Sequence, residues 1–173
     1  SAQRLEGDGA AAKGEAGEPV LRPWVIHEGG VRTNGHGIGY GDINGDGRED
    51  IIFGNGWYER PKGDIAAPWA LHNDWQWPHA STPMIVTDLG GDGRNDVIWG
   101  HGHNYGLWWE ERRDDNKDGT TNWRTHLIDD RFSQPHALGW EDLDNDGQPE
   151  LISGRRVRAH SGEQELSLHG WSM

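Results

Sequence analysis

The fold of this chain can be predicted from the stretch Asp42-Ile-Asn-Gly-Asp-Gly-Arg-Glu-Asp50. It places oxygen-bearing side chains at positions 1, 3, 5 and 9 of a nine-residue loop, and glycine at position 6. Calcium takes about six to eight oxygen ligands, so a short loop that binds it must fold back on itself, and glycine supplies the backbone freedom for that turn. We therefore predict a calcium-binding loop. Its side-chain ligands would be Asp42, Asn44, Asp46 and Asp50.

Two further copies of this loop follow in the chain. The second runs from Asp88 to Asp96 and has glycine at position 3, while the third runs from Asp142 to Glu150 and ends in glutamate. None of the three is an EF-hand, because position 12 is never glutamate and no helical pattern flanks the loops. A turn rich in aspartate and glycine that binds no ion is the alternative. We expect about two to three calcium ions, with the further ligands Asp88, Asp92, Asp96, Asp142, Asp144, Asp146 and Glu150.

The loops mark an internal repeat with a period of 46 and then 54 residues. Each repeat opens with a Trp-x-x-His segment, which starts at Trp24, Trp69 and Trp123, and each loop is followed by a short apolar run that ends in glycine. Such runs are typical of buried strands, and four short strands in about 40 to 50 residues is the scale of a propeller blade. The sequence predicts an all-β fold of about three four-stranded antiparallel blades, in a β-propeller that is partial or completed by oligomerisation.

The repeat also gives the expected domain organisation. Residues 1–18 are rich in glycine, alanine and acidic residues without apolar periodicity, which indicates a flexible leader. The β-propeller repeat domain is expected over 19–173, with blades at about 24–68, 69–122 and 123–173. Because propellers typically have about four to eight blades, closure of the ring is expected to need further blades or self-association.

Composition limits the possible partners. The formal net charge is −13 and no basic stripe is visible, which argues against a nucleic-acid partner. No apolar run approaches the roughly twenty residues of a membrane span. Cysteine is absent, so disulfides and thiolate metal sites are excluded. The 11 tryptophans can fill a core for which few aliphatic residues are available. We expect an extracellular or periplasmic protein, although no targeting segment is present in the sequence.

Three segments, GDINGDGREDIIFGNGWYE, TDLGGDGRNDVIWGHGHNYGLWWEE and EDLDNDGQPELISGRR, resemble the FG-GAP/VCBS repeats of calcium-binding β-propellers. The resemblance extends over about residues 24–160. It implies the propeller fold and calcium in the loops. It implies no particular activity, because this architecture serves adhesion, ligand recognition and polysaccharide cleavage alike.

A narrower resemblance begins at Ser133-Gln-Pro-His-Ala-Leu138 and continues through Gly154-Arg-Arg156 and His160-Ser-Gly162. This succession is similar to that of propeller proteins related to aldos-2-ulose dehydratase, a sugar lyase. That family has Gly-Lys-Arg where this chain has Gly-Arg-Arg, and its Asn-Gly-x-Asp-Pro-Gly continuation is replaced here by Ser161-Gly-Glu-Gln-Glu165. The resemblance implies a carbohydrate lyase or dehydratase as an alternative function.

The blade topology implied by the resemblance predicts where a functional site would form. If the innermost strand of each blade directly precedes its loop, the segments before that strand and after the next strand meet at one mouth, opposite the calcium loops. The ligand-binding residues expected there are His36, His101, His103, Tyr105, Trp77 and His160. The candidate catalytic residues are His136, His79, Arg155 and Arg156. By contrast, the histidines of the Trp-x-x-His segments are expected to form structural hydrogen bonds.

Three functions remain open from the sequence. The leading one is a calcium-stabilised propeller module that binds carbohydrate or another small polar extracellular ligand at the mouth. The first alternative is a lyase acting by β-elimination, in which His136 or His79 removes the proton next to a carbonyl. Arg155, Arg156 or a further divalent ion at the histidine cluster would then stabilise the oxyanion. The second alternative is a structural module for protein interaction.

Overall fold

The computed structural model describes residues 36–80, 83–117 and 120–156. Every regular element within these ranges is a β-strand. Among the described residues no helix is long and apolar enough to cross a membrane. The predicted leader, the Trp24 segment and His160 lie outside the described residues.

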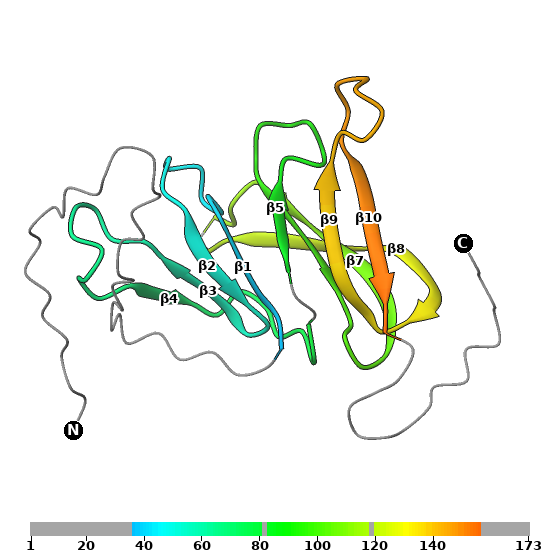
Figure 1. Ribbon diagram of the computed structural model, residues 1–173. Helices are drawn as coiled ribbons and strands as arrows, with labels where there is room; N and C mark the ends of the chain where they lie inside the picture. Colours follow the sequence, from blue (N-terminus) through cyan, green and yellow to red (C-terminus); the bar gives the residue numbers. More distant parts are fainter. Residues whose placement is uncertain (1–35, 81–82, 118–119, 157–173) are drawn as a thin grey trace, which may run out of the picture.

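The strands form three antiparallel sheets, with four strands in the first, four in the second and two described strands in the third (Figure 1). The all-β prediction is confirmed, and the strand order follows the chain within each four-stranded sheet. Over the described residues the sheets do not close a ring. Sheet 1 contains β1 (Ile38–Gly41), β2 (Asp50–Phe53), β3 (Gly56–Glu59) and β4 (Ala70–His72). Sheet 2 contains β5 (Ile85–Thr87), β6 (Asp96–Gly100), β7 (Tyr105–Arg113) and β8 (Asn122–Ser133), and sheet 3 contains β9 (Pro135–Glu141) and β10 (Glu150–Arg155).

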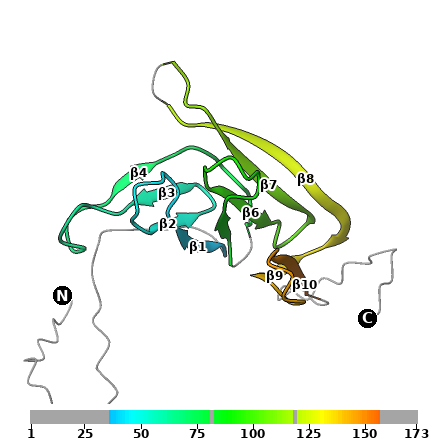
Figure 2. The same ribbon diagram turned by 90° about the horizontal axis from the view of Figure 1, so that it is seen from above.

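Each nine-residue loop joins the first strand of a sheet to the second, as the sequence predicts. Seen from above, β1 and β9 lie on the inner side of the arc of sheets, and β4 and β8 lie on its outer side (Figure 2). The Trp-x-x-His segments that start at Trp69 and Trp123 lead into β4 and lie in β8, the fourth strands of sheets 1 and 2. Each of these two sequence repeats therefore starts at the last strand of one sheet and continues into the strands of the next.

Two apolar clusters hold the three sheets together. The cluster between sheets 1 and 2 is rich in tryptophan, and full burial of one large apolar side chain contributes about 1.5–3 kcal/mol. The smaller cluster lies between sheets 2 and 3 and includes Ile98, Leu107 and Leu138. The members of the larger cluster are Ile43, Ile52, Trp57, Trp75, Trp77, Ala80, Met84, Val97 and Trp99.

Glycine allows the inner strands of sheets 1 and 2 to approach closely. A Cβ atom at Gly39 would lie 2.5 Å from the backbone oxygen of Met84, and one at Gly41 would lie 2.5 Å from Cβ of Val86. Gly39 and Met84 also form an isolated β-bridge. Larger residues on this face of β1 would therefore separate the two sheets.

The outer-strand histidines have a structural role, as predicted. His72 stacks on Trp57 with ring centroids 4.0 Å apart, and its Nε2 lies 3.0 Å from Oε2 of Glu59. His126 stacks on Trp109 at 4.4 Å, and its Nε2 lies 2.7 Å from a carboxylate oxygen of Glu111. These contacts repeat in sheets 1 and 2, so they support the blades rather than a ligand.

Candidate functional site

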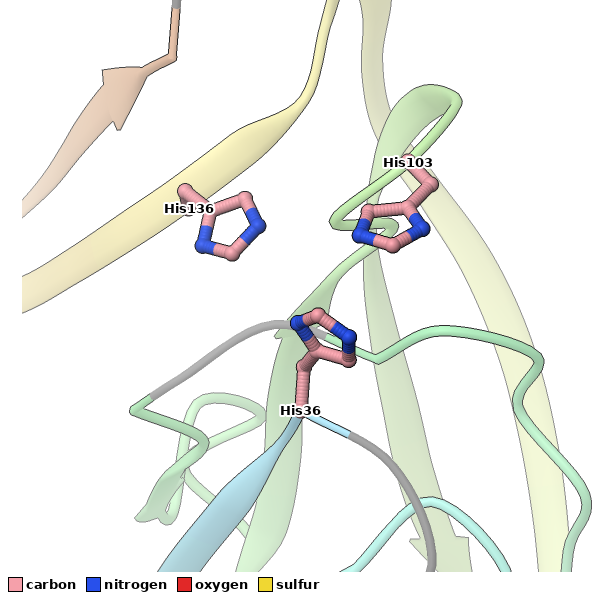
Figure 3. Close-up of side chains that lie close together, drawn as sticks. All are labelled: His36, His103 and His136. Atoms are coloured by element: carbon pink, nitrogen blue, oxygen red, sulfur yellow. The ribbon is translucent and has the colours of Figure 1, made fainter. Parts of the chain in front are cut away.

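Three histidines from three different sheets meet at one end of the strands (Figure 3). His36 lies just before β1, His103 lies in the turn between β6 and β7, and His136 lies in β9. One ring nitrogen from each lies within 4.8 Å of the others. The ring centroids of His36 and His103 are 4.6 Å apart, and those of His36 and His136 are 6.0 Å apart. We call these three residues the histidine mouth.

Two more of the predicted mouth histidines join this cluster. The ring of His79 stacks on that of His103 with centroids 4.8 Å apart, and it lies 6.0 Å from the ring of His101. His79 has φ of 56°, in the left-handed region that non-glycine residues rarely adopt. Such strained residues cluster at functional sites.

Gly102 brings the turn between β6 and β7 close to the mouth. Its backbone N–H donates to the carbonyl oxygen of His79 at 2.7 Å. A Cβ atom at Gly102 would lie 3.3 Å from Nε2 of His136 and 3.1 Å from the His79 oxygen. The lack of a side chain here lets the rings of His103 and His136 approach, a role that the repeat pattern does not predict.

Gln134 is a second residue near the mouth that sequence reasoning missed. It is buried and has φ of 54°. Its N–H donates to the Asn104 carbonyl at 2.8 Å, while its own carbonyl accepts from the Arg156 N–H at 3.1 Å. Its Oε1 accepts from Nε of Arg156 at 3.0 Å. Gln134, which lies two residues before His136, thus fixes the Arg156 guanidinium.

The remaining predicted mouth residues that the structure describes come from β7, β10 and the segment after β4. Tyr105 begins β7 and is 39% exposed, and Arg155 ends β10 in an exposed position. Trp77 is buried between Trp75 and Trp99, with centroid distances of 4.2 Å and 5.0 Å.

A cavity of about 460 Å³ lies beside this tryptophan stack. Its wall includes the carboxylates of Asp74 and Glu110, which the motif analysis did not identify. Glu110 accepts from Nε1 of Trp99 at 3.2 Å and from the Thr125 hydroxyl at 2.7 Å. Burial raises the pKa of Glu110, because the ionised carboxylate loses hydration there. Asp74 accepts from the indole N–H groups of two tryptophans, Trp57 and Trp123.

The nine-residue loops lie at the opposite ends of the strands from the histidine mouth. In the first loop, Asp42 folds the chain around its carboxylate by accepting from the N–H groups of Gly45, Asp46 and Gly47. Arg48 forms an ion pair with Asp46. The second and third loops repeat the first-position contacts, since Asp88 accepts from Gly93 N–H and Asp142 accepts from Gly147 N–H.

The carboxylate at position 9 fastens each of the first two loops to its sheet. Asp50 is fully buried and accepts from the N–H groups of Ile43 and Arg60, and Asp96 accepts from those of Leu89 and Arg112. Burial raises the pKa of Asp50 to about 6 and also raises the pKa of Asp96. These two carboxylates therefore have a structural function in addition to the predicted metal binding.

The third loop brings three of its predicted ligands together. One carboxylate oxygen from each of Asp142, Asp144 and Glu150 lies within 4.8 Å of the others. Oxygen donors of this kind fit a hard cation such as calcium, whereas the imidazole nitrogens of the histidine mouth fit a transition metal such as zinc. Within the described ranges these are the two groups of at least three histidine or acidic side chains with metal-binding separations.

Comparison with protein families gives one match. A family model described as an FG-GAP-like repeat matches residues 88–153, from the start of the second loop into β10. This match indicates an FG-GAP-like repeat over these residues, and the four-stranded antiparallel sheets are consistent with propeller-like blades. Neither the curated proteins nor the solved structures gave a significant match.

Proposed function

We propose that this chain is a β-propeller-type binding module whose ligand site is the histidine mouth and whose nine-residue loops hold calcium. The main support is the convergence of His36, His103 and His136 from three sheets, with ring nitrogens within 4.8 Å of one another. The FG-GAP-like match suggests an interaction module of the propeller type. Repeats of this kind typically occur in extracellular or periplasmic proteins, so we propose the same location here.

The donor set of the mouth favours a bound divalent transition metal. Three neutral imidazoles are a common ligand set for zinc, and a three-ligand site keeps a position open for a hydroxyl or carboxylate of a ligand. Carbohydrate or another small polar molecule is therefore the ligand class that we propose. In this arrangement His79 packs on His103 and Gly102 leaves room for His136, so both residues would orient the imidazoles.

Calcium in the loops would have a different purpose. In the third loop, the carboxylates of Asp142, Asp144 and Glu150 come from both ends of the β9–β10 connection, so one ion would neutralise their mutual repulsion and tie the two strands together. Because such a site is assembled only in the folded chain, the binding free energy adds to the stability of the fold.

Calorimetric titration with zinc tests the mouth. We expect the calcium-loaded protein to bind zinc and His136→Ala to lose at least about tenfold in affinity, since one of three ligands is removed. His126→Ala is the matched control, because His126 lies in the outer strand β8 and its ring contacts Glu111 of β7. The same proteins are then tested for retention on a panel of polysaccharide columns with and without zinc. Equal zinc binding by wild type and His136→Ala, with no zinc-dependent retention, would exclude the mouth as the binding site.

A lyase acting by β-elimination is the second candidate function. It is favoured by the strained backbone of His79 and by the Arg156 guanidinium, which donates to Gln134, two residues before His136. A histidine would remove the proton next to a carbonyl or carboxylate, and the guanidinium would stabilise the resulting enolate. The enolate would then expel the oxygen substituent on the β-carbon with its bonding electrons, which leaves a carbon–carbon double bond. An unsaturated product that absorbs in the ultraviolet, formed by wild type but not by His136→Ala, would identify this activity. Ligand retention without such a product would identify the binding module.

A further inference from the structure

Sheet 1 has an apolar face that points away from sheet 2. Side chains alternate along a strand, so Ile38 and Tyr40 lie opposite the glycines of β1 that contact sheet 2. Ile38 is 51% exposed and Tyr40 is 71% exposed. The pairing register continues Tyr40 across the sheet in one row with Ile51, Tyr58 and Leu71. We call this face the leading face.

The equivalent faces of the other two sheets are covered. Met84 precedes the second loop by the same number of residues as Ile38 precedes the first, and Leu138 holds the same position before the third. Met84 is 3% exposed and packs against the glycine face of β1, while Leu138 is 7% exposed and packs against sheet 2. Of these three equivalent residues, Ile38 is thus the one that is exposed.

The opposite face of sheet 3 shows the converse exception. Ile152 is 42% exposed, whereas its repeat counterparts Ile52 and Ile98 are fully buried against the next sheet. Leu143 is 63% exposed, whereas its counterpart Ile43 in the first loop is fully buried. Ile152 pairs with Gly139, the counterpart of the glycine that lets β1 and β5 approach. We call this second surface the trailing face.

The two exposed faces are therefore equivalent to the two surfaces that meet where sheet 1 packs on sheet 2. In that contact, large side chains before a loop cover glycine and apolar side chains of the preceding sheet. We propose that the leading and trailing faces bind a second copy of this chain head to tail. The leading face of each copy covers the trailing face of the other, so that the three described sheets of each copy take part in one ring.

The arrangement of the sheets favours a second copy of this chain as the binding partner of the two faces. A head-to-tail contact closes into a ring when the rotation between copies permits it, and two copies of the three described sheets fall within the range of about four to eight blades that propellers typically have. A contact between two leading faces would instead oppose large side chains to large side chains, unlike either interface between sheets in the chain. The ring would also place both histidine mouths around one axis, whether or not they bind a metal.

Light scattering coupled to gel filtration tests the proposal in calcium-containing buffer. Wild type should have twice the chain mass of 19.4 kDa at micromolar concentration. Tyr40→Lys and Ile152→Lys should each weaken dimerisation more than about tenfold, because each puts a charge into an apolar contact. Leu127→Lys is the matched control, since Leu127 is 48% exposed on β8, outside both faces. Melting curves show whether each variant is folded.

A mixing experiment tests the head-to-tail arrangement itself. Tyr40→Lys keeps an intact trailing face and Ile152→Lys keeps an intact leading face, so an equimolar mixture should form dimers that neither variant forms alone. A wild-type protein that stays monomeric up to about 100 µM would overturn the proposal, since interfaces of this kind reach micromolar affinity or better. So would a dimer that both lysine variants leave unchanged, or a mixture that remains monomeric.

Discussion

The two ends of the strands differ in how their chemistry is assembled. At the loop end, the carboxylates that would bind an ion come from nine consecutive residues, as in Asp142–Glu150. At the mouth, the imidazoles of His36, His103 and His136 come from three sheets. The loop site is therefore local and needs only one connection between two strands. The mouth depends on how sheets pack, so a change in packing should affect it first.

Calcium removal should give the largest effect and should act at the loop end alone. A site held at 100 times its dissociation constant adds about 2.7 kcal/mol to the stability of the fold. We expect excess EDTA to lower the melting temperature and added calcium to restore it in differential scanning calorimetry. His136→Ala should show the same calcium dependence as wild type. Identical melting with EDTA and with calcium would mean that the loops are turns without ions.

Gly39→Ala should damage the mouth while sparing the loops. The added Cβ would lie 2.5 Å from the Met84 backbone oxygen, so sheets 1 and 2 must separate, and overpacking of this kind costs about 1–3 kcal/mol. We expect a lower melting temperature and weaker zinc binding in calorimetry, with calcium still raising the melting temperature. Gly90→Ala is the control, because its Cβ would meet no atom closer than 3.7 Å. Equal zinc affinity in the two variants would contradict the dependence of the mouth on sheet packing.

Gly102→Ala should change the mouth alone. Its Cβ would lie 3.3 Å from Nε2 of His136, which requires a shift of a few tenths of an ångström. We expect zinc affinity to fall about tenfold, equivalent to about 1.4 kcal/mol, with little change in melting temperature. Competition with a chromogenic zinc chelator measures the affinity. A large fall in melting temperature would assign Gly102 to the fold instead.

Glu110 and Glu111 should give the smallest effects, with opposite signs. Burial raises the folded-state pKa of Glu110, so its ionisation destabilises the fold as pH rises above the unfolded value of 4.5. The hydrogen bond from His126 lowers the pKa of Glu111, so that carboxylate stabilises the fold above 4.5, and this stability is lost as pH falls through its folded pKa.

Urea unfolding at pH 7 should therefore find Glu110→Gln more stable than wild type and Glu111→Gln less stable. The ionisation of Glu110 should also lower the stability of the wild type as pH rises from 4.5 to 7. Glu110→Gln should lack this contribution. Shifts of the same sign in both variants would contradict these assignments.

The sequence predicts the parts of the molecule that depend on local spacing. The Asp42 loop joins β1 to β2 as expected, and the apolar run after it forms β2, in which Ile52 and Phe53 are both buried. Sequence reasoning also predicted which histidines would gather, because the repeat places His36 and His136 at the starts of inner strands.

Single residues with long-range roles could not be predicted in this way. None of Gln134, Glu110 and Asp74 is part of the motifs that recur in the repeats. Their side-chain hydrogen-bond partners lie 11 to 49 residues away in the chain. Trp77, expected to bind a ligand at the mouth, lies within the stack between Trp75 and Trp99 and lines the cavity beside it. Its position depends on how the segment after β4 packs on Trp99 of β6, which no repeat position encodes.

One contact between neighbouring loops has a consequence for ion binding. The side-chain amide of Asn95, at position 8 of the second loop, donates to the backbone oxygen of Asp42, the first residue of the first loop, at 2.6 Å. Ordering either loop therefore helps to order the other, and by linkage the two sites should bind cooperatively. The third loop has Pro149 at position 8, which has no side-chain donor. Calcium titration should thus separate into a coupled pair and one independent site.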